Sequence, residues 1–301
     1  MRLSFTGLGT ALITPFTRTG AVDEVAVRRL ASRQADAGVH FLVPCGTTGE
    51  APTLSAGERR RVIEIVADEI EGRAMVLAGA GGYDTREVIR SVQDARDAGA
   101  HGILSVAPYY SRPTQEGLYQ HYRAIAESTK LPVMVYNVPS RTGCNVEPAT
   151  LARLAGIPNI VGVKEASGNL MQMNQICQVT PPEFLVLSGD DALALPLMVI
   201  GGRGLISVTS NQMPAEMVSL IEAAERGDFL SARRWHHRLL PLMQVNFVES
   251  NPIPVKFAMA AMGMCETQYR LPLVPPAAAA QQQILAALRQ FGLPIVTRLP
   301  A

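Results

Sequence analysis

The sequence has few of the features that mark membrane-spanning, zinc-ribbon or nucleic-acid-binding proteins. It holds only four cysteines, Cys45, Cys144, Cys177 and Cys265. They lie far apart without a C-x-x-C pair, which excludes a zinc ribbon and predicts free thiols in a reducing compartment. The longest apolar runs, such as 192–200, fall well short of the ~18 residues that span a bilayer. Neither charge dominates, since 27 Lys and Arg face 26 Asp and Glu without long runs, so no binding to nucleic acid or membrane is predicted.

What is present is the composition of a compact globular protein. Apolar residues make up 48% of the 301 residues and charged residues 18%, which excludes disorder for most of the chain. The first residues carry only Arg2 before an apolar run and have no small-residue cleavage site, so we expect no secretory signal and a cytoplasmic location. We therefore expect a small molecule as the partner.

Eight short apolar runs recur along the first 210 residues. Their starts are about 28 residues apart, which leaves room for one helix and two loops between consecutive strands. Most are apolar on both faces, as is typical of parallel strands buried on both sides. This predicts an α/β fold, a closed (β/α)8 TIM barrel, with a doubly wound open sheet as the alternative. The predicted strands are 8–13, 40–45, 74–80, 102–107, 132–138, 160–166, 184–189 and 204–210.

Helix signals fill the intervals between these runs. Ser55 with Glu58, and Asp84 with Glu87, have the spacing of capping boxes, in which each side chain satisfies an amide of the first helical turn. Apolar residues recur at helical spacing over 58–70, which predicts a helix that covers the sheet.

The strand pattern stops at about Gly227. Two helical stretches follow, at 228–248 and 281–290. We predict a catalytic barrel over residues 1–226 and a C-terminal helical extension over residues 227–301.

Lys164 is the sharpest candidate for chemistry, because it lies inside a run that should be buried. An ammonium there must be paired or deprotonated, and desolvation lowers the pKa of a lysine and makes its amine a nucleophile for carbonyl carbon. Schiff-base chemistry is one interpretation, and a structural ion pair is the other. Side chains alternate between the two faces of a strand with a period of two residues. This places Lys164 with Gly162 and Ile160 on one face and Glu165 on the other, which disfavours pairing of Lys164 with Glu165.

Further polar residues follow the strands, where a βα barrel assembles its site. The G-T-T-G-E loop at 46–50 offers hydroxyls and amides for an anion, although such threonines can also bond their own backbone. Tyr136 ends the fifth predicted strand beside Lys164, either as a proton relay or as a solvated phenol. Arg141 offers a fork for a carboxylate, or is simply solvated. His236 and His237 are adjacent and cannot both face one metal site, so no metal is expected.

Together these residues resemble the dihydrodipicolinate synthase family, also called 4-hydroxy-tetrahydrodipicolinate synthases. The resemblance extends to about residue 292. The G-T-T-G-E loop at 46–50 and the segment of Lys164 at 162–166 are shared among pyruvate-dependent aldolases. The Y-N-V-P-S-R-T-G segment at 136–143 is much more specific to this family. The segments are G-T-T-G-E at 46–50, P-Y-Y at 108–110, Y-N-V-P-S-R-T-G at 136–143, G-V-K-E-A at 162–166 and N-P-I-P-V-K at 251–256.

The resemblance implies condensation of pyruvate with L-aspartate 4-semialdehyde on the way to diaminopimelate and lysine. By the same resemblance Lys164 forms the Schiff base, and Thr47, Tyr136 and Tyr110 move protons. No external cofactor is expected. The resemblance also implies a tight dimer, in which Tyr110 reaches into the site of the neighbouring subunit. Two such dimers would form a homotetramer.

Substrate-binding residues carry over in the same way. Thr48 joins Thr47 in holding the pyruvate carboxylate, Gly189 and Ile206 line the site through their backbones, and Arg141 receives the carboxylate of the semialdehyde. Two alternatives stay open here: another pyruvate aldolase, such as an N-acetylneuraminate lyase or keto-sugar acid aldolase, and a catalytically silent barrel that senses a keto acid. Arg141 fits a short acid better than a polyol.

Lysine-inhibited family members also have an effector pocket at the tight-dimer interface. The corresponding positions here are Ala51, Arg59, Tyr83, Glu87 and Tyr109. The first three depart from the serine, histidine and asparagine of the inhibited enzymes, which removes hydrogen bonds worth ~1 kcal/mol each. We therefore expect weak or absent inhibition by lysine.

Overall fold

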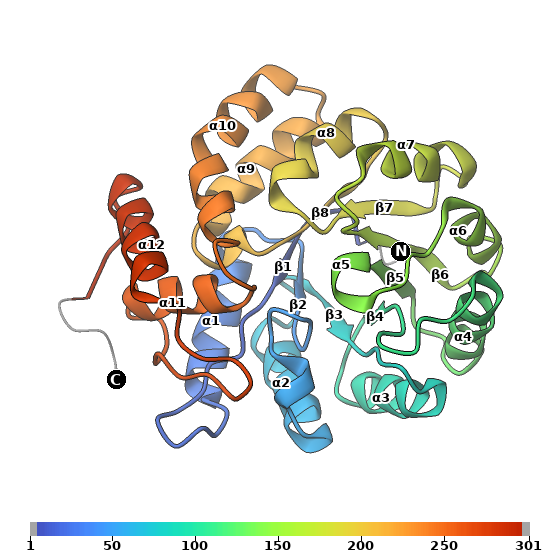
Figure 1. The fold of residues 1–301 in the computed structure, drawn as a ribbon, viewed down its shortest axis with the longest axis horizontal. Helices are drawn as coiled ribbons and strands as arrows, with labels where there is room; N and C mark the ends of the chain where they lie inside the picture. The colour runs from blue at the N-terminus through green and yellow to red at the C-terminus, as the bar shows by residue number, and fades with distance from the viewer. Residues whose placement is uncertain (1–4, 297–301) are drawn as a thin grey trace.

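Eight parallel strands close into a barrel in the computed structural model, which describes residues 5–296 (Figure 1). β1 pairs with β8 to close the barrel, with Gly7 opposite Gly204. This confirms the (β/α)8 barrel and excludes the open sheet. The strands are β1 (Gly7–Ala11), β2 (Phe41–Val43), β3 (Met75–Gly79), β4 (Gly102–Val106), β5 (Val133–Asn137), β6 (Ile160–Glu165), β7 (Leu185–Ser188) and β8 (Gly204–Ser207).

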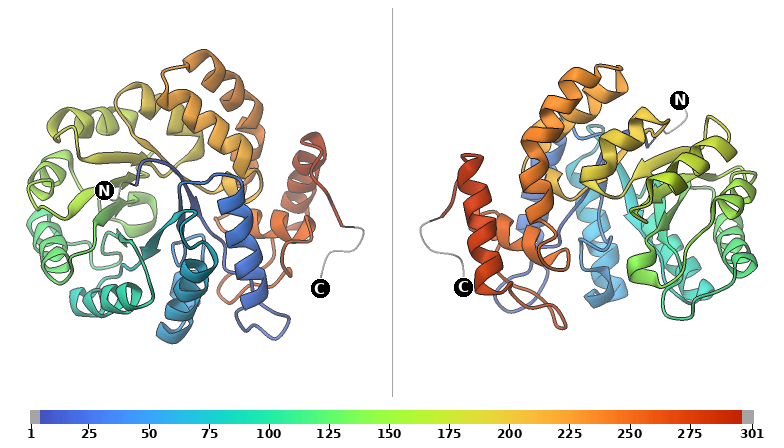
Figure 2. Two further views of the ribbon diagram at one scale, coloured as in Figure 1. Left: turned by 180° about the vertical axis from the view of Figure 1, so that it is seen from behind. Right: turned by 45° about the horizontal axis from the view of Figure 1, so that its top comes forward.

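Helices alternate with the strands and surround the barrel (Figures 1 and 2). The surrounding helices are α1 (Glu24–Asp36), α2 (Ala56–Glu69), α3 (Thr85–Asp97), α4 (Gln115–Glu127), α6 (Pro148–Leu154), α7 (Leu170–Val179), α8 (Ala194–Val199) and α9 (Pro214–Glu225). Short turns of helix lie in loops that follow strands: η1 (Ala51–Thr53), α5 (Pro139–Thr142), η2 (Asp191–Leu193) and η3 (Thr209–Asn211). The eighth strand therefore ends at Ser207, where the predicted run continued to residue 210.

One of the two predicted capping boxes is present. At α2 the Glu58 amide donates to the Ser55 hydroxyl over 3.2 Å, and the Ser55 amide donates to the Glu58 carboxylate over 2.9 Å. The box predicted at Asp84 is wrong. Asp84 accepts from the second amide of α3 rather than the third, and the exposed Glu87 carboxylate pairs with Arg90 one turn along the helix.

Apolar side chains form two cores, one inside the barrel and one between the strands and the helices. Lys164 faces the inside, as period two predicts. Ile160 does not share that face, because it packs in the outer core. The pairing of β5 with β6 shifts by one residue, since Val133 lies opposite Ile160 whereas Met134 lies opposite Gly162. Such an irregularity reverses the alternation of faces.

The chain ends in three helices beyond the barrel: α10 (Phe229–Val245), α11 (Ile253–Ala261) and α12 (Ala278–Gln290). α10 and α12 correspond to the two predicted helices. α11 has no amphipathic pattern because all nine of its residues are buried, so periodicity does not reveal it. Figures 1 and 2 show α12 at the outer edge of the molecule, with α11 between it and α1. Within residues 5–296 no helix has the length and apolar character needed to cross a bilayer.

Candidate active site

Lys164 and Tyr136 lie side by side on neighbouring strands inside the barrel. The register of β5 and β6 places them directly opposite each other. The Lys164 Nζ atom lies 4.2 Å from the centroid of the Tyr136 ring, and both residues are buried. The predicted adjacency of amine and phenol is therefore confirmed.

Lys164 forms no ion pair with a carboxylate of residues 5–296. Among residues 5–296 the fully buried ion pair is that of Lys256 with Glu50, and no carboxylate lies within 4 Å of the Lys164 Nζ atom. Glu165 points to the other side of β6, where the Asn137 amide group and the Ser167 backbone N–H donate to it over 2.8 Å each. Burial raises the pKa of Glu165, and these hydrogen bonds oppose the rise. The structural ion pair considered for Lys164 is thus excluded within the described chain.

The two threonines of the G-T-T-G-E loop lie between β2 and η1. Thr47 is partly exposed, and Thr48 is buried. The Thr48 hydroxyl accepts from the Asn251 side chain over 2.9 Å. Cys45 and Glu50 at the two ends of the loop have φ values of 56° and 54°, a left-handed conformation that non-glycine residues seldom adopt.

Gly189 and Ile206 follow on the far side of Lys164. A Cβ atom at Gly189 would lie 3.0 Å from the Lys164 Cε atom, so the backbone of this residue passes directly against the lysine side chain. Ile206 belongs to the inner core. The end of β8 is fixed by the buried Asp191, which accepts from the Ser207 hydroxyl and the Val208 N–H. Burial raises the pKa of Asp191.

Arg141 lies on α5, the short helix that follows β5 and lies beside it in Figure 1. One guanidinium N–H donates to the Asn251 carbonyl over 2.9 Å, and the side chain lines the same cavity as Tyr136. The fork is thereby held at the entrance, with its other N–H groups available to a ligand.

Tyr110 is not brought to Lys164 within this chain. Its residue is 93% exposed and its φ is 69°, so the backbone of the 109–112 loop turns its ring outward. The neighbouring Tyr109 instead packs edge-to-face on Tyr83 with centroids 5.3 Å apart.

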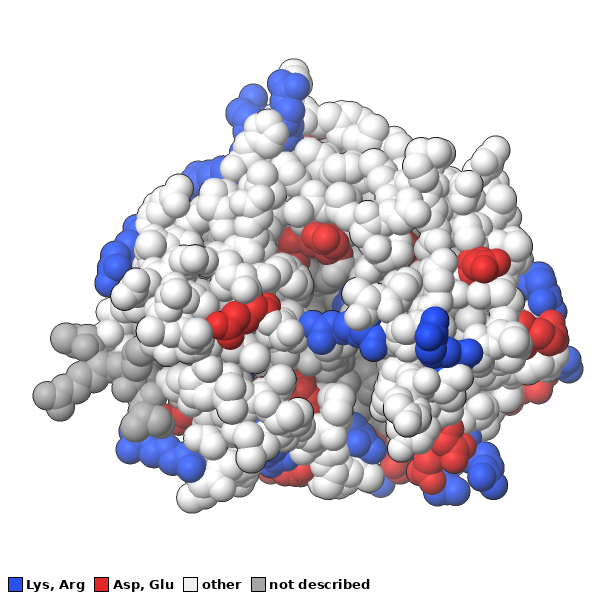
Figure 3. All heavy atoms as spheres, viewed as in Figure 1, with Lys and Arg blue, Asp and Glu red and all other residues white. Residues whose placement is uncertain are grey.

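A cavity of about 720 Å³ lies beside Tyr136, and the buried Lys164 is not among the residues that line it. Its lining includes Thr47, Tyr136 and Arg141. The five positions expected to form an effector pocket also line it: Ala51, Arg59, Tyr83, Glu87 and Tyr109. The face in Figure 3 is hollowed near its middle, and the visible charged groups of both signs lie scattered around the hollow and the periphery.

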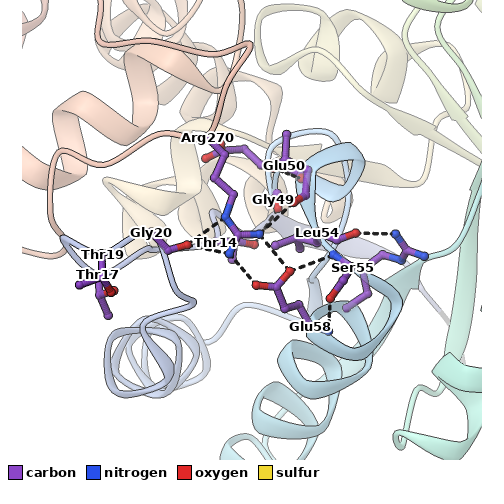
Figure 4. Close-up of polar contacts among 12 residues, drawn as sticks. Thr14, Thr17, Thr19, Gly20, Gly49, Glu50, Leu54, Ser55, Glu58 and Arg270 are labelled. Atoms are coloured by element: carbon purple, nitrogen blue, oxygen red, sulfur yellow. Dashed lines mark hydrogen bonds and ion pairs between the residues drawn. The ribbon is translucent and has the colours of Figure 1, made fainter.

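Three residues of the C-terminal segment contact the 46–58 region, and no role was predicted for them. Asn251 bonds Thr48, and Lys256 lies 2.5 Å from a Glu50 carboxylate oxygen. Arg270 bonds Gly20, Thr53 and Glu58, and Figure 4 shows it reaching between Gly20 and Glu58. Asn251 and Lys256 lie in the N-P-I-P-V-K segment, so that motif was the signal, although sequence spacing does not reveal its partners.

Cys45 is packed rather than reactive. It is 2% exposed, and burial raises the pKa of its thiol to about 12. Its sulfur contacts the Arg59 carbonyl at 3.6 Å. This agrees with an inert cysteine. Among the residues that the structure describes, no three or more His, Cys, Asp or Glu side chains are grouped as metal ligands.

Comparison with known proteins matches the whole arrangement to one family. The model of the dihydrodipicolinate synthetase family matches residues 4–291. A 4-hydroxy-tetrahydrodipicolinate synthase of Nitratidesulfovibrio vulgaris is 50% identical over 292 residues, which are 97% of this chain and 100% of the relative. That of Pelodictyon phaeoclathratiforme is 49% identical over 288 residues, covering 95% and 97%. The crystal structure of dihydrodipicolinate synthase from Aquifex aeolicus superposes with a TM-score of 0.95 at 42% identity, covering 97% and 99%.

Proposed function

The chain belongs to the dihydrodipicolinate synthetase family, and from this we propose how its side chains carry out the family's reaction. It condenses pyruvate with L-aspartate 4-semialdehyde to give 4-hydroxy-tetrahydrodipicolinate, in diaminopimelate and lysine biosynthesis. It is a Schiff-base-forming lyase of the class I aldolase type.

The observation that carries the assignment is the buried Lys164 amine beside Tyr136. We assign the Schiff base to Lys164 because its Nζ atom lies 4.2 Å from the Tyr136 ring centroid and no carboxylate of the described residues pairs with it. A lysine so placed is a suitable nucleophile for a carbonyl carbon.

The reaction balances without an oxidant or an external cofactor. The Lys164 amine adds to the C2 carbonyl of pyruvate and water leaves, which gives a protonated imine. Loss of a proton from the methyl group gives an enamine, whose carbon attacks the aldehyde carbon of the semialdehyde. The semialdehyde's own amino group then attacks the imine carbon, which closes the ring and releases Lys164. One water is lost overall.

Proton transfer falls to the hydroxyl groups around the amine. The Tyr136 ring lies against the Lys164 amine, and Thr47 lines the same cavity as Tyr136. We assign these two residues, with Tyr110 from a neighbouring copy, to the movement of protons during imine formation, aldol addition and cyclisation.

The remaining assignments concern binding. We assign Thr47 and Thr48 to the pyruvate carboxylate and the backbones of Gly189 and Ile206 to the wall of the site. Arg141 stands at the cavity entrance, where its fork suits the carboxylate of a short second substrate. A polyol aldehyde would leave this guanidinium without a charged partner, which disfavours the sugar-acid aldolases.

The assembly is part of the proposal. Tyr110 is 93% exposed whereas Lys164 is buried, which supports a tight dimer as the smallest complete unit and a homotetramer as a dimer of dimers. We also propose a cytoplasmic location. The proposed division is a catalytic barrel over residues 1–226 and a helical extension over residues 227–301.

Reductive trapping tests the assignment directly. The chain has only three lysines, Lys130, Lys164 and Lys256, so an adduct is located by one peptide map. Borohydride with pyruvate should add irreversible mass to Lys164 alone. An adduct on Lys130 or Lys256, or trapping that persists in Lys164→Ala, would show that the Schiff base is assigned to the wrong residue. A steady-state assay with L-aspartate 4-semialdehyde completes the test.

A further inference from the structure

A buried ion pair ties the C-terminal extension to the threonine loop. Lys256 on α11 and Glu50 at the end of the loop are both fully buried, with 2.5 Å between the Nζ atom and a carboxylate oxygen. The same Nζ atom lies 3.9 Å from the centroid of the Phe16 ring. The chain uses arginine almost everywhere else, since only three of its 27 basic residues are lysines, and two of those three are buried.

Such a pair is a poor way to gain stability alone. Removing two charges from water costs about as much as their attraction returns, and an apolar pair of similar volume is often as stable. Burial lowers the pKa of Lys256, whereas the Glu50 carboxylate opposes that change. A conformational role explains the pair better than a contribution to stability.

The loop that the pair holds is strained. Glu50 and Cys45 have φ values of 54° and 56°, and the two substrate-facing threonines lie between them. Non-glycine residues persist in this conformation only where their surroundings fix them. A Cβ atom at Gly49 would lie 3.1 Å from the Leu12 carbonyl oxygen, so the loop is also tightly enclosed.

Neighbouring contacts fix the loop at successive residues. Asn251, five residues before Lys256, donates to the Thr48 hydroxyl over 2.9 Å. The Thr14 hydroxyl donates to the Gly49 carbonyl over 2.7 Å, a contact shown beside Glu50 in Figure 4. Lys256 differs from these contacts because it forms an ion pair with Glu50, which is itself one of the residues with a left-handed backbone.

We propose that Lys256, through Glu50, is a positioning residue that holds Thr47 and Thr48 in the geometry needed to bind the pyruvate carboxylate. This rests on the proposed function of the two threonines. Lys256 is fully buried and does not line the cavity, so it should act through the threonines alone and affect the binding of pyruvate more than that of the semialdehyde.

The test replaces the pair while keeping its shape. Glu50→Gln with Lys256→Met removes both charges together and leaves no buried charge without a partner. Glu50→Gln alone is milder, because the amide oxygen still accepts from Lys256 and the lysine can lose its proton. The matched control is Leu239→Ala, a fully buried residue of α10 in the same extension. It lowers stability without touching the 45–50 loop.

We expect the KM for pyruvate to rise about tenfold or more in the double variant and several-fold in Glu50→Gln, with the KM for the semialdehyde within about twofold. Leu239→Ala should lower the melting temperature and leave both constants within about twofold. A folded double variant or a folded Glu50→Gln with a pyruvate KM within about twofold of wild type overturns the proposal. So does failure of both variants to fold, because the pair then serves the fold itself.

Reductive trapping in the wild type distinguishes failure of the proposed function from failure of the positioning role of Lys256. If pyruvate is not trapped on wild-type Lys164, the proposed function fails. If it is trapped there and the variants need no more pyruvate for half-maximal trapping, only the positioning role of Lys256 fails.

Discussion

Gly189→Ala should disable the enzyme by adding a single methyl group against the reactive lysine. The new Cβ atom would lie 2.7 Å from the Ala166 Cβ atom, 3.0 Å from the Lys164 Cε atom and 3.3 Å from its Cγ atom. Carbon atoms pack best at about 3.5–4.0 Å, so something must move. Ala166 is short and fixed to the backbone, whereas the lysine side chain is flexible. A shift of the backbone at residue 189 must therefore relieve the contact with Ala166, whereas retreat of the lysine side chain relieves the contact with Lys164.

The size of the effect follows from these distances. Lys164 must retreat by roughly 0.5–1 Å, and a misplacement of about 1 Å costs on the order of 10²-fold in rate. We expect imine formation to slow by about 10- to 100-fold. Overpacking costs about 1–3 kcal/mol, which for a chain of this size lowers the melting temperature by about 2–5 °C.

The assay is the single-turnover rate at which borohydride traps pyruvate on Lys164, together with the steady-state rate. Gly57→Ala is the control, because a Cβ atom there meets nothing within 4 Å and the residue lies on the first turn of α2. It should leave the trapping rate unchanged. A trapping rate in Gly189→Ala within about twofold of wild type would refute the reasoning that the glycine exists to admit the lysine.

Four further predictions use other parts of the molecule. Tyr110→Phe should lower kcat by about 10²-fold and leave the fold intact, since it removes a single hydroxyl group; unchanged turnover in a steady-state assay removes Tyr110 from proton transfer. Arg141→Ala should raise the KM for the semialdehyde far more than that for pyruvate, and equal changes would contradict the carboxylate assignment. Burial lowers the pKa of His121 to about 4, so its contribution to stability is complete above pH ~6.5 and about 3 kcal/mol is lost as the pH falls to about 4. Urea unfolding at pH 7 and pH 4 measures this loss of stability, and His121→Gln should largely abolish it. An equal loss in the His121→Gln variant would show that other groups cause the loss. Lysine should inhibit weakly even at about 1 mM, because Arg59 and Tyr83 replace the hydrogen-bonding groups of the inhibited pattern; half-inhibition well below 1 mM in a lysine titration would show that the altered pocket still binds it.

The C-terminal extension contacts residues that we assign to substrate binding. Asn251 contacts Thr48 and also accepts from Arg141 through its carbonyl. One residue outside the barrel thus contacts both the G-T-T-G-E loop, which we assign to pyruvate, and Arg141, which we assign to the second substrate. The extension therefore cannot be removed without disturbing both binding groups.

The sequence alone determined the barrel and the central pair of the site. Period two and the βα spacing are local properties, so eight buried strands and their order could be inferred from neighbouring residues. Because consecutive strands of such a barrel pair in register, Tyr136 and Lys164 had to lie close together. The resemblance then supplied the reaction, which periodicity does not contain.

Only the tertiary structure decided what surrounds that pair. The partner of Glu50 is 206 residues away in sequence, and that of Thr48 is 203 residues away, so no local pattern identifies Lys256 or Asn251. The irregularity that turns Ile160 away from the lumen depends on how β6 meets β5, and the outward direction of Tyr110 on the left-handed backbone of its loop. Strand faces follow from the covalent geometry of a few residues, whereas loop positions and buried charge pairs depend on which distant segments the closed barrel brings into contact.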